Sequence, residues 1–107
     1  MKLLVKVILF FVVITKGYSQ EVGIVKGTVM HSKTREMMPF VNVTIEGTTK
    51  GDTTNEKGEF FIDNVGLGYV KVIASFIGYT TVLSDDYLVT REKSPYIKLE
   101  IIENRAE

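Results

Sequence analysis

Between residues 47 and 79 the chain alternates apolar and polar residues, and short glycine-containing segments interrupt the alternation. Phe60 and Ile62 fall in one phase of the alternation and Phe61 in the other, and the same period of two continues over residues 69–77. This period is typical of β-strands, whose successive side chains point to opposite faces. Glycine suits the intervening turns because a positive φ angle costs it little. The turns are Asn55-Glu56-Lys57-Gly58, Gly66-Leu67-Gly68 and Gly78. The stretch therefore predicts three strands joined by tight turns.

The rest of the chain after residue 19 continues in the same way and has no sustained helical period. We predict about seven strands, and they lie at residues 23–31, 40–46, 50–54, 60–65, 69–77, 79–83 and 96–101, with a short extended piece at 87–89. Short strands at spacings of about ten residues are typical of β-sandwiches. The sequence therefore predicts a small all-β domain made of two packed sheets.

The interior of this sandwich is predicted from the same alternation. The inward residues are Val25, Val29, Val41, Val43, Ile45, Phe60, Ile62, Val70, Val72, Phe76, Ile97 and Leu99. Each contributes roughly 1.5–3 kcal/mol when it is fully buried. Because the total is of the same order as the entropy lost on folding, we expect a domain of modest stability.

Four short motifs occur in order along this region. They are Val25-Lys26-Gly27-Thr28-Val29, the segment from Pro39 to Thr48, Thr54-Asn55-Glu56-Lys57-Gly58-Glu59-Phe60, and Ile77-Gly78-Tyr79. Together they resemble the carboxypeptidase regulatory-like domain, and the resemblance covers residues 23–99. Asn55 stands where that family usually has aspartate, and asparagine caps a turn about as well.

The resemblance implies a Greek-key β-sandwich of the transthyretin type. It also implies a context, since such domains often form the N-terminal extension of SusC-type TonB-dependent outer-membrane receptors in Bacteroidetes. The family takes its name from metallocarboxypeptidases, but this sequence lacks the catalytic part of those enzymes. The resemblance therefore implies an accessory domain.

The beginning of the chain has the three regions of a signal peptide. Lys2 and Lys6 form a basic start, and residues 7–14 are an unbroken apolar run. Small residues follow at Gly17 and Ser19, in the spacing that signal peptidase recognises. A membrane-spanning helix needs about 20 apolar residues, and this run is far shorter.

We therefore expect a helical signal peptide at residues 1–19 that is removed before Gln20, and a domain at residues 20–107. The mature chain is predicted to have no spanning helix and to be exported, to the periplasm or the outer membrane. A receptor would continue beyond residue 107 into a plug and a barrel. The chain is then either a fragment of such a receptor or a free-standing domain.

Charge and composition exclude several classes of function. The chain has 13 basic and 13 acidic residues, but residues 1–19 hold three lysines and no acid. Residues 20–107 therefore carry ten basic and 13 acidic residues. An acidic balance argues against binding to nucleic acid, which needs a basic surface. With no cysteine, the chain has no disulfide, thiolate metal site or cysteine nucleophile.

Residues suited to catalysis are few. His31 is the only histidine, and we interpret it as a solvated loop residue at a strand end. No serine lies in the G-x-S-x-G setting of a nucleophile. The sequence predicts no catalytic residue, no cofactor and no enzyme activity.

One acidic segment has part of a calcium-loop spacing. Asp52, Thr54, Glu56 and Asp63 occupy ligand-like places, but Lys57 stands where the loop requires glycine. We interpret these residues as the polar part of a hairpin. The neighbouring acids Asp85 and Asp86 are interpreted as a solvated turn. The sequence therefore predicts no metal site.

Two features favour binding instead. A sandwich has edge strands, and residues 50–54 or the last strand can pair with an incoming chain. Aromatic residues outside the predicted core are interpreted mainly as packing in a second layer, with a binding patch as the alternative; they are Phe61, Tyr69, Tyr79, Tyr87 and Tyr96.

The function that we predict is that of a non-enzymatic, exported interaction domain, the N-terminal domain of a TonB-dependent receptor for nutrient uptake. Its expected partner is an envelope protein or the outer-membrane receptor machinery. The alternative is a free-standing periplasmic or surface module that binds a carbohydrate or a protein.

Overall fold

The computed structural model describes residues 21–104, and every regular element within that range is a β-strand. The predicted signal peptide at residues 1–19 lies outside the described residues. The strands are β1 (Val22–His31), β2 (Asn42–Ile45), β3 (Gly51–Thr53), β4 (Glu59–Gly66), β5 (Gly68–Val70), β6 (Val72–Ser75), β7 (Tyr79–Thr80), β8 (Val82–Leu83), β9 (Tyr87–Val89) and β10 (Tyr96–Glu103).

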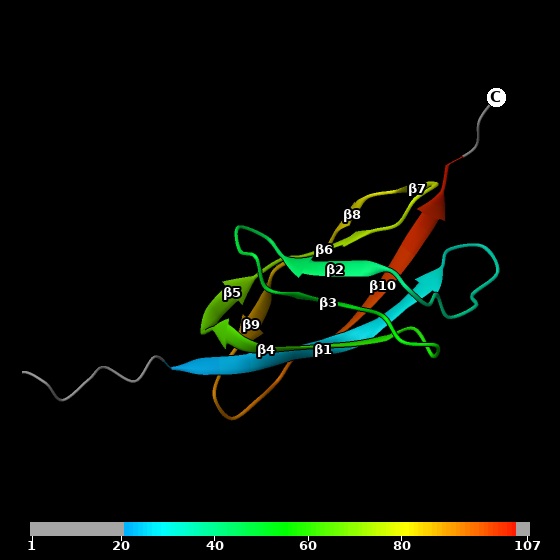
Figure 1. Cartoon of the computed structure of the whole chain (residues 1–107). Helices are drawn as coiled ribbons and strands as arrows, with labels where there is room; N and C mark the ends of the chain where they lie inside the picture. Colours follow the sequence, from blue (N-terminus) through cyan, green and yellow to red (C-terminus); the bar gives the residue numbers. More distant parts are fainter. Residues whose placement is uncertain (1–20, 105–107) are drawn as a thin grey trace, which may run out of the picture.

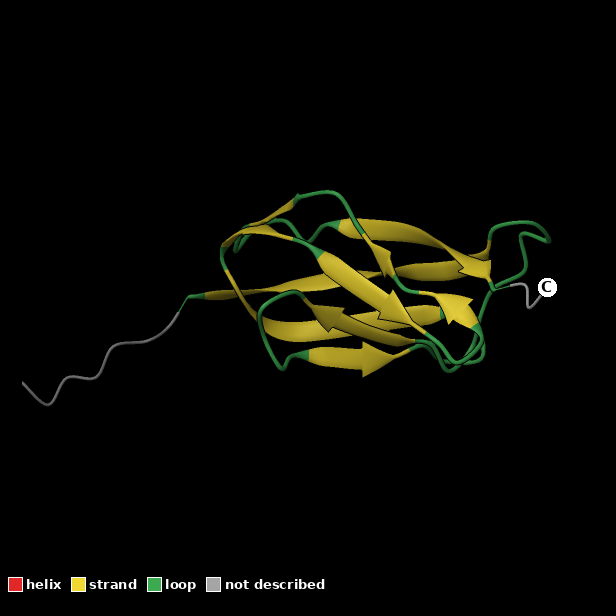
Figure 2. Ribbon diagram, turned by 90° about the horizontal axis from the view of Figure 1, so that it is seen from above, coloured by secondary structure: helices red, strands yellow, loops and turns green. Residues whose placement is uncertain are grey.

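The strands form two four-stranded sheets that face each other, as Figures 1 and 2 show. The first sheet has the order β4-β1-β10-β7, and the second has the order β3-β2-β6-β8. A two-stranded sheet of β5 and β9 lies near one end (Figure 1). Only β1 and β10 pair in parallel, and the other pairs are antiparallel. The predicted all-β sandwich is confirmed.

The number of strands differs from the prediction because two predicted strands change sheets partway. Residues 69–77 divide into β5, which pairs with β9, and β6, which pairs with β2. Residues 79–83 divide into β7, which pairs with β10, and β8, which pairs with β6. Alternation of side chains can continue through such a crossing, so a period of two does not reveal where the hydrogen-bonding partner changes.

The predicted strand at residues 40–46 also begins too early. Phe40 has a φ angle of 64° and is 66% exposed, and regular pairing starts only at Asn42. The Phe40 N–H donates to the Thr54 carbonyl at 3.0 Å, outside the regular ladder. A positive φ is rare for a bulky residue and is incompatible with a strand. The sequence gives no signal for it at this position.

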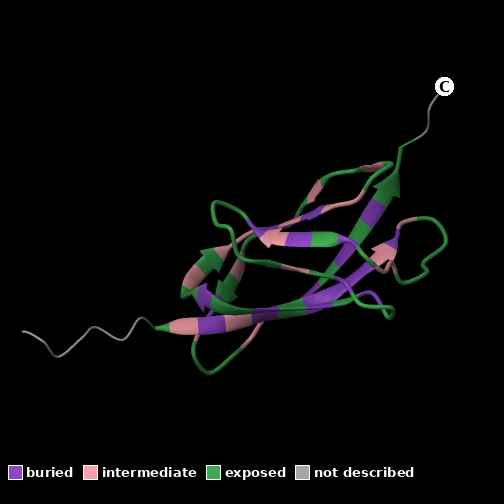
Figure 3. Cartoon of the chain, in the orientation of Figure 1, coloured by how far each residue is buried: buried purple, intermediate pink, exposed green. Residues whose placement is uncertain are grey.

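The core lies between the two sheets, where buried segments of β1, β2, β4 and β10 face inward (Figure 3). Ten of the twelve predicted inward residues are buried, and Val70 and Phe76 are partly buried against the core. The core also contains four buried apolar residues that the alternation does not predict; they are Val65, Ala74, Val89 and Ile101. The predicted buried face of the main strands is therefore confirmed.

Two buried hydroxyl groups bind backbone groups where regular pairing ends. The Thr54 hydroxyl accepts from the Val41 N–H at 2.9 Å and donates to the Met38 carbonyl at 2.7 Å. The Ser84 hydroxyl accepts from the Val72 N–H at 2.8 Å. Each hydroxyl satisfies a backbone group that would otherwise be buried without a partner.

Replacing Thr54 with valine should lower the free energy of unfolding by about 1–3 kcal/mol. Valine keeps the size of the side chain but leaves the buried Val41 N–H and the Met38 carbonyl without partners. The matched control is Thr53→Val, because the neighbouring Thr53 is exposed; it should change stability by less than about 0.5 kcal/mol. Urea denaturation measures both variants, and equal losses would show that the Thr54 hydrogen bonds do not stabilise the fold.

Candidate interaction edges

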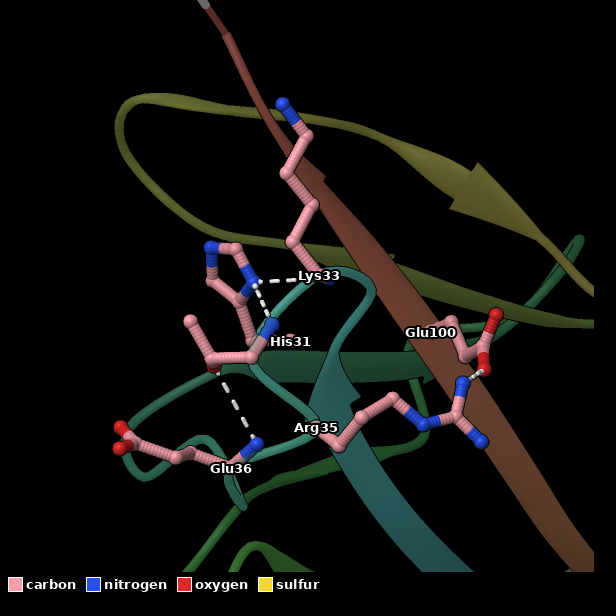
Figure 4. Close-up of polar contacts among 6 residues, drawn as sticks. His31, Lys33, Arg35, Glu36 and Glu100 are labelled. Carbon is pink, nitrogen blue, oxygen red and sulfur yellow. Dashed lines mark hydrogen bonds and ion pairs between the residues drawn. The ribbon is translucent and has the colours of Figure 1, made fainter.

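His31 ends β1, as predicted, but the predicted solvated position is wrong because the residue is buried. Its Nδ1 accepts hydrogen bonds from the N–H groups of Lys33 at 3.1 Å and Thr34 at 3.2 Å, as Figure 4 shows. Its ring packs edge-on against Tyr79, with ring centroids 5.8 Å apart. His31 Nδ1 therefore caps the turn after β1, and Nε2 of the same ring lies 3.6 Å from the Glu103 carboxylate.

The acidic residues with calcium-loop spacing do not converge. The Asp52 carboxylate accepts hydrogen bonds from the backbone N–H groups of Phe61 and Thr53. The Thr54 hydroxyl is buried and is bonded to backbone groups of Met38 and Val41. Within residues 21–104, no three histidine, cysteine, aspartate or glutamate side chains are grouped so as to hold a metal ion. The hairpin interpretation therefore fits the geometry better than a metal loop.

Asn55 shows how that hairpin is held. Its Oδ1 accepts from the N–H groups of Lys57 and Glu59, both at 2.9 Å, and its Nδ2 donates to the Glu59 carboxylate at 3.1 Å. This is the turn capping that the sequence predicts for asparagine at this position. Gly58 completes the turn with a φ angle of 73°.

The side of the sandwich formed by β3 and β4, named here the closed edge, has its backbone groups covered by charged side chains. In β4, the backbone groups of Phe60 and Ile62 face β1, so those of Phe61, a non-hydrogen-bonded pair of Lys26, point away from β1. The Asp52 carboxylate accepts from the Phe61 N–H at 2.9 Å. The Lys50 ammonium donates to the Asn64 carbonyl. Charged residues placed across an edge in this way prevent pairing with another strand.

The opposite side of the first sheet, along β10, is different. The carbonyl groups of Pro95 and Ile101 accept from β1 and the turn that follows it, at 3.3 Å from Lys26 N and 3.0 Å from Ser32 N. Asn104 N donates to the Gly78 carbonyl on the other side, at 2.8 Å. Odd-numbered residues of β10 therefore point their backbone groups towards β1, and even-numbered ones point away from it.

Strand β7 covers only the end of that outer side. It pairs with Ile102 and Glu103, after which the chain crosses to the second sheet as β8. Within the described residues, no backbone hydrogen bond reaches the outer N–H and C=O groups of Tyr96, Lys98 and Glu100. We call these groups the free β10 edge. Of the two sides of the first sheet, the β4 side is therefore covered by side chains and the β10 side is open.

A groove of about 420 Å³ runs beside the free β10 edge. Its lining includes Lys98 to Glu100 of β10, Val82 to Asp85 of the β8 segment, and Tyr87. Leu83 is half exposed there. On the outer face, the Arg35 guanidinium pairs with the Glu100 carboxylate (Figure 4). The edge is therefore bordered by apolar side chains as well as by charges.

The aromatic residues outside the predicted core have different roles. Tyr79 and Tyr87 pack against the core, whereas Phe61, Tyr69 and Tyr96 are exposed. Phe61 and Tyr96 are both direct cross-strand neighbours of Lys26 and so share the outer face of the first sheet. A second groove of about 440 Å³ is lined by Lys26, Phe61 and Tyr96 and by polar residues of the closed edge.

Comparison with known proteins places the domain in a family. Residues 25–105 match the model of the CarboxypepD_reg-like domain, so the chain belongs to this family. No curated protein matches the chain. Within residues 21–104 there is no helix with the length and hydropathy needed to cross a membrane.

Two solved structures show a similar fold. One is a chain of the type II cohesin–X-dockerin complex from Acetivibrio cellulolyticus, a C-terminal interface mutant, with a TM-score of 0.64 and 21% identity over 74% of this chain. The other, an N-terminal interface mutant of that complex, has a TM-score of 0.64 and 22% identity over 76% of this chain. The match covers 56% and 58% of those chains, less than two thirds of their length.

Proposed function

We propose that this chain is a non-enzymatic, exported interaction domain that binds a protein of the cell envelope through the free β10 edge. The observation that carries the proposal is the difference between the two edges of the first sheet. Side chains of Asp52 and Lys50 cover the β4 side, whereas Lys98 and Glu100 keep outward backbone groups available on the other side. Main-chain hydrogen bonds to such an edge are a common basis of peptide recognition.

A non-enzymatic role is supported by how the two side chains best suited to hydrolysis are used. An activated nucleophile or a metal-bound water requires a positioned base. The imidazole Nδ1 of His31 is occupied by two backbone N–H groups, and the Asp52 carboxylate is occupied by two others. Both groups therefore hold the backbone of the domain, which favours a structural role for them.

The receptor context is the more specific part of the proposal. Family membership and the predicted signal peptide support an N-terminal domain of a TonB-dependent outer-membrane receptor for nutrient uptake. The cohesin–X-dockerin structures show that a similar fold occurs in a chain of a protein complex. A reading frame that continues downstream into a plug and a barrel would support the receptor context, and an isolated frame would favour a free-standing module.

A carbohydrate-binding module is the second candidate. It is supported by the exposed Phe61 and Tyr96 on either side of Lys26, above a groove with polar lining. Exposed aromatic rings with nearby polar groups suit a ligand that has both apolar and hydroxyl-bearing faces. Glycan binding that is lost in Phe61→Ala and Tyr96→Ala, with no change in Lys98→Pro, would favour this candidate over the first.

The test of the first candidate is capture of proteins from the envelope of the native organism, followed by mass spectrometry. Proline at Lys98 removes an outward N–H and leaves the ladder to β1 intact. The control is Thr53→Pro on the closed edge, where the outward N–H of Thr53 donates to the Asp52 carboxylate at 2.8 Å and so offers no free donor. An envelope protein should be retained by the wild type and by Thr53→Pro and lost by Lys98→Pro.

Folding of each variant is checked by urea denaturation, and Glu100→Pro serves as a second variant at the same edge. Capture that survives both β10 variants would overturn the proposed role of this edge. Loss in the Thr53→Pro control as well would also overturn it, since binding would then depend on the whole fold rather than on β10.

Export is tested separately. The basic start, the apolar run and the small residues at Gly17 and Ser19 predict cleavage before Gln20. Mass spectrometry of the protein from its native host should show a new N-terminus at or close to Gln20. Recovery of the chain from the cytoplasm with Met1 intact would contradict export.

A further inference from the structure

After β7 the chain leaves the outer side of β10, so no described strand pairs with Glu100 and Lys98 on that side. Gly78 lies opposite Asn104, and Thr80 lies opposite Ile102. If β7 continued in the same direction, its next two alternate residues would lie opposite Glu100 and then Lys98. The chain instead crosses at Thr81 to join the second sheet. The places opposite Glu100 and Lys98 are therefore unoccupied by any described strand.

Resting on the proposed function, we propose that an extended peptide segment of the partner occupies these places, antiparallel to β10 and in line with β7. The segment is amphipathic, with apolar side chains towards the groove and an acidic side chain opposite Lys98. Antiparallel pairing follows from the direction of β7, which already pairs with β10 in this sense. In such a pair, the partner residue opposite Lys98 forms two hydrogen bonds with it, one to its N–H group and one to its C=O group. The partner residue opposite Glu100 does the same.

The inward side of the segment is predicted from the groove. The incoming residues next to Leu99 would point towards the space between the sheets, beside Val82, Leu83 and Tyr87. Leu83 is half exposed in the free domain, so an apolar side chain placed there would bury surface that now contacts water. Alternate residues of the partner segment should therefore be apolar.

The outward side is predicted from the charges of β10. Glu100 is already paired with Arg35, so its charge is compensated within the domain. Lys98 is exposed and forms no ion pair within residues 21–104. Opposite charges directly across two antiparallel strands are favourable. The partner residue opposite Lys98 is therefore acidic.

A second copy of this domain fits the edge less well. Antiparallel pairing of two β10 strands with Lys98 opposite Glu100 also sets Tyr96 opposite Ile102 of the other copy. The outer side of Ile102 is occupied by β7. A segment of another protein needs no β7 of its own at this position and fits the edge without this conflict.

The experiment uses two soluble synthetic peptides that alternate threonine and valine. One carries glutamate at the central threonine position, and the other carries lysine there. Each is titrated into the isotopically labelled full chain and its Lys98→Glu variant, and backbone amide signals are followed by NMR. The glutamate peptide should bind the wild type up to about fivefold more tightly than the lysine peptide. This order should reverse in Lys98→Glu.

The position of binding is read from the same spectra. Amide signals of Lys98 and Glu100 should shift and become protected from exchange, while those of Phe61 and Thr53 at the closed edge should not change. Absence of binding, equal binding of the two peptides by both proteins, or shifts at the closed edge would overturn the inference. If envelope capture still depends on Lys98 in that case, the proposed function stands and only this mode of recognition fails.

Discussion

Replacing Gly27 with alanine is expected to lower the free energy of unfolding by more than about 3 kcal/mol, enough to unfold much of a domain of this size. Gly27 lies in the middle of β1, between its parallel partner Ile97 and its antiparallel partner Phe60. An ideal Cβ at this position would overlap the Ile97 carbonyl oxygen, and it would lie 2.7 Å from the carbonyl carbon and 2.8 Å from Phe60 Cζ. Because both neighbours are fixed in the sheet and the core, neither can move without breaking pairing or packing.

Gly66→Ala is the matched control for this prediction. A Cβ at Gly66 meets no atom within 4 Å, and no positive φ angle restricts the position. Circular dichroism and urea denaturation should show a near-native Gly66→Ala and an unfolded or strongly destabilised Gly27→Ala. A Gly27→Ala variant as stable as the wild type would mean that β1 and β10 are not paired in this parallel register.

The second large effect is expected for Phe60→Ala, which should cost about 3–5 kcal/mol of the free energy of unfolding. Phe60 is 3% exposed and belongs to the core, whereas the next residue, Phe61, is 53% exposed. The two positions have the same side chain in consecutive places of β4, so only the face of the sheet differs. Phe61→Ala should therefore change stability by less than about 1 kcal/mol.

Denaturant midpoints of the two phenylalanine variants give a direct reading of the register. A shift by one residue would exchange the effects of Phe60→Ala and Phe61→Ala, because it moves every side chain to the other face. Equal losses would contradict a sheet with one buried and one exposed face. Lys71→Ala, at a half-buried surface position, should stay within about 0.5 kcal/mol of the wild type.

Alternation in the sequence was sufficient to predict the sandwich and most of its core. The phase that contains Phe60 and Ile62 is the buried one, and the turn around Asn55 has the capping that its sequence predicts. These features depend on local patterns of side chains and turn residues. They could be predicted because each depends on the types of a few consecutive residues.

Features that depend on distant partners could not be predicted in the same way. The crossings at Lys71 and Thr81 change the paired strand without interrupting the alternation. The burial of His31 depends on Tyr79, which lies on another strand. Pairing partners of this kind are set by the three-dimensional arrangement and have no local signal in a single sequence.

The candidate site shows the same limit. The sequence singles out residues 50–54 and the last strand as edges of equal standing. In the first of these segments, Asp52 and Lys50 reach Phe61 and Asn64 and so cover the outer edge of β4. Charged residues in an edge strand are a known signal of such protection. That signal was present in the sequence, but the strand that these charges cover becomes evident only from the packing of β3 beside β4.

Amide hydrogen exchange of the isolated domain tests most directly whether β10 has an open edge. The N–H groups of Ile97 and Leu99 point to β1, whereas those of Lys98 and Glu100 point outward with no partner in the described residues. We expect Ile97 and Leu99 to exchange at least about a hundredfold more slowly than Lys98 and Glu100. Protection of Lys98 and Glu100 equal to that of Leu99, with no partner added, would contradict the open edge.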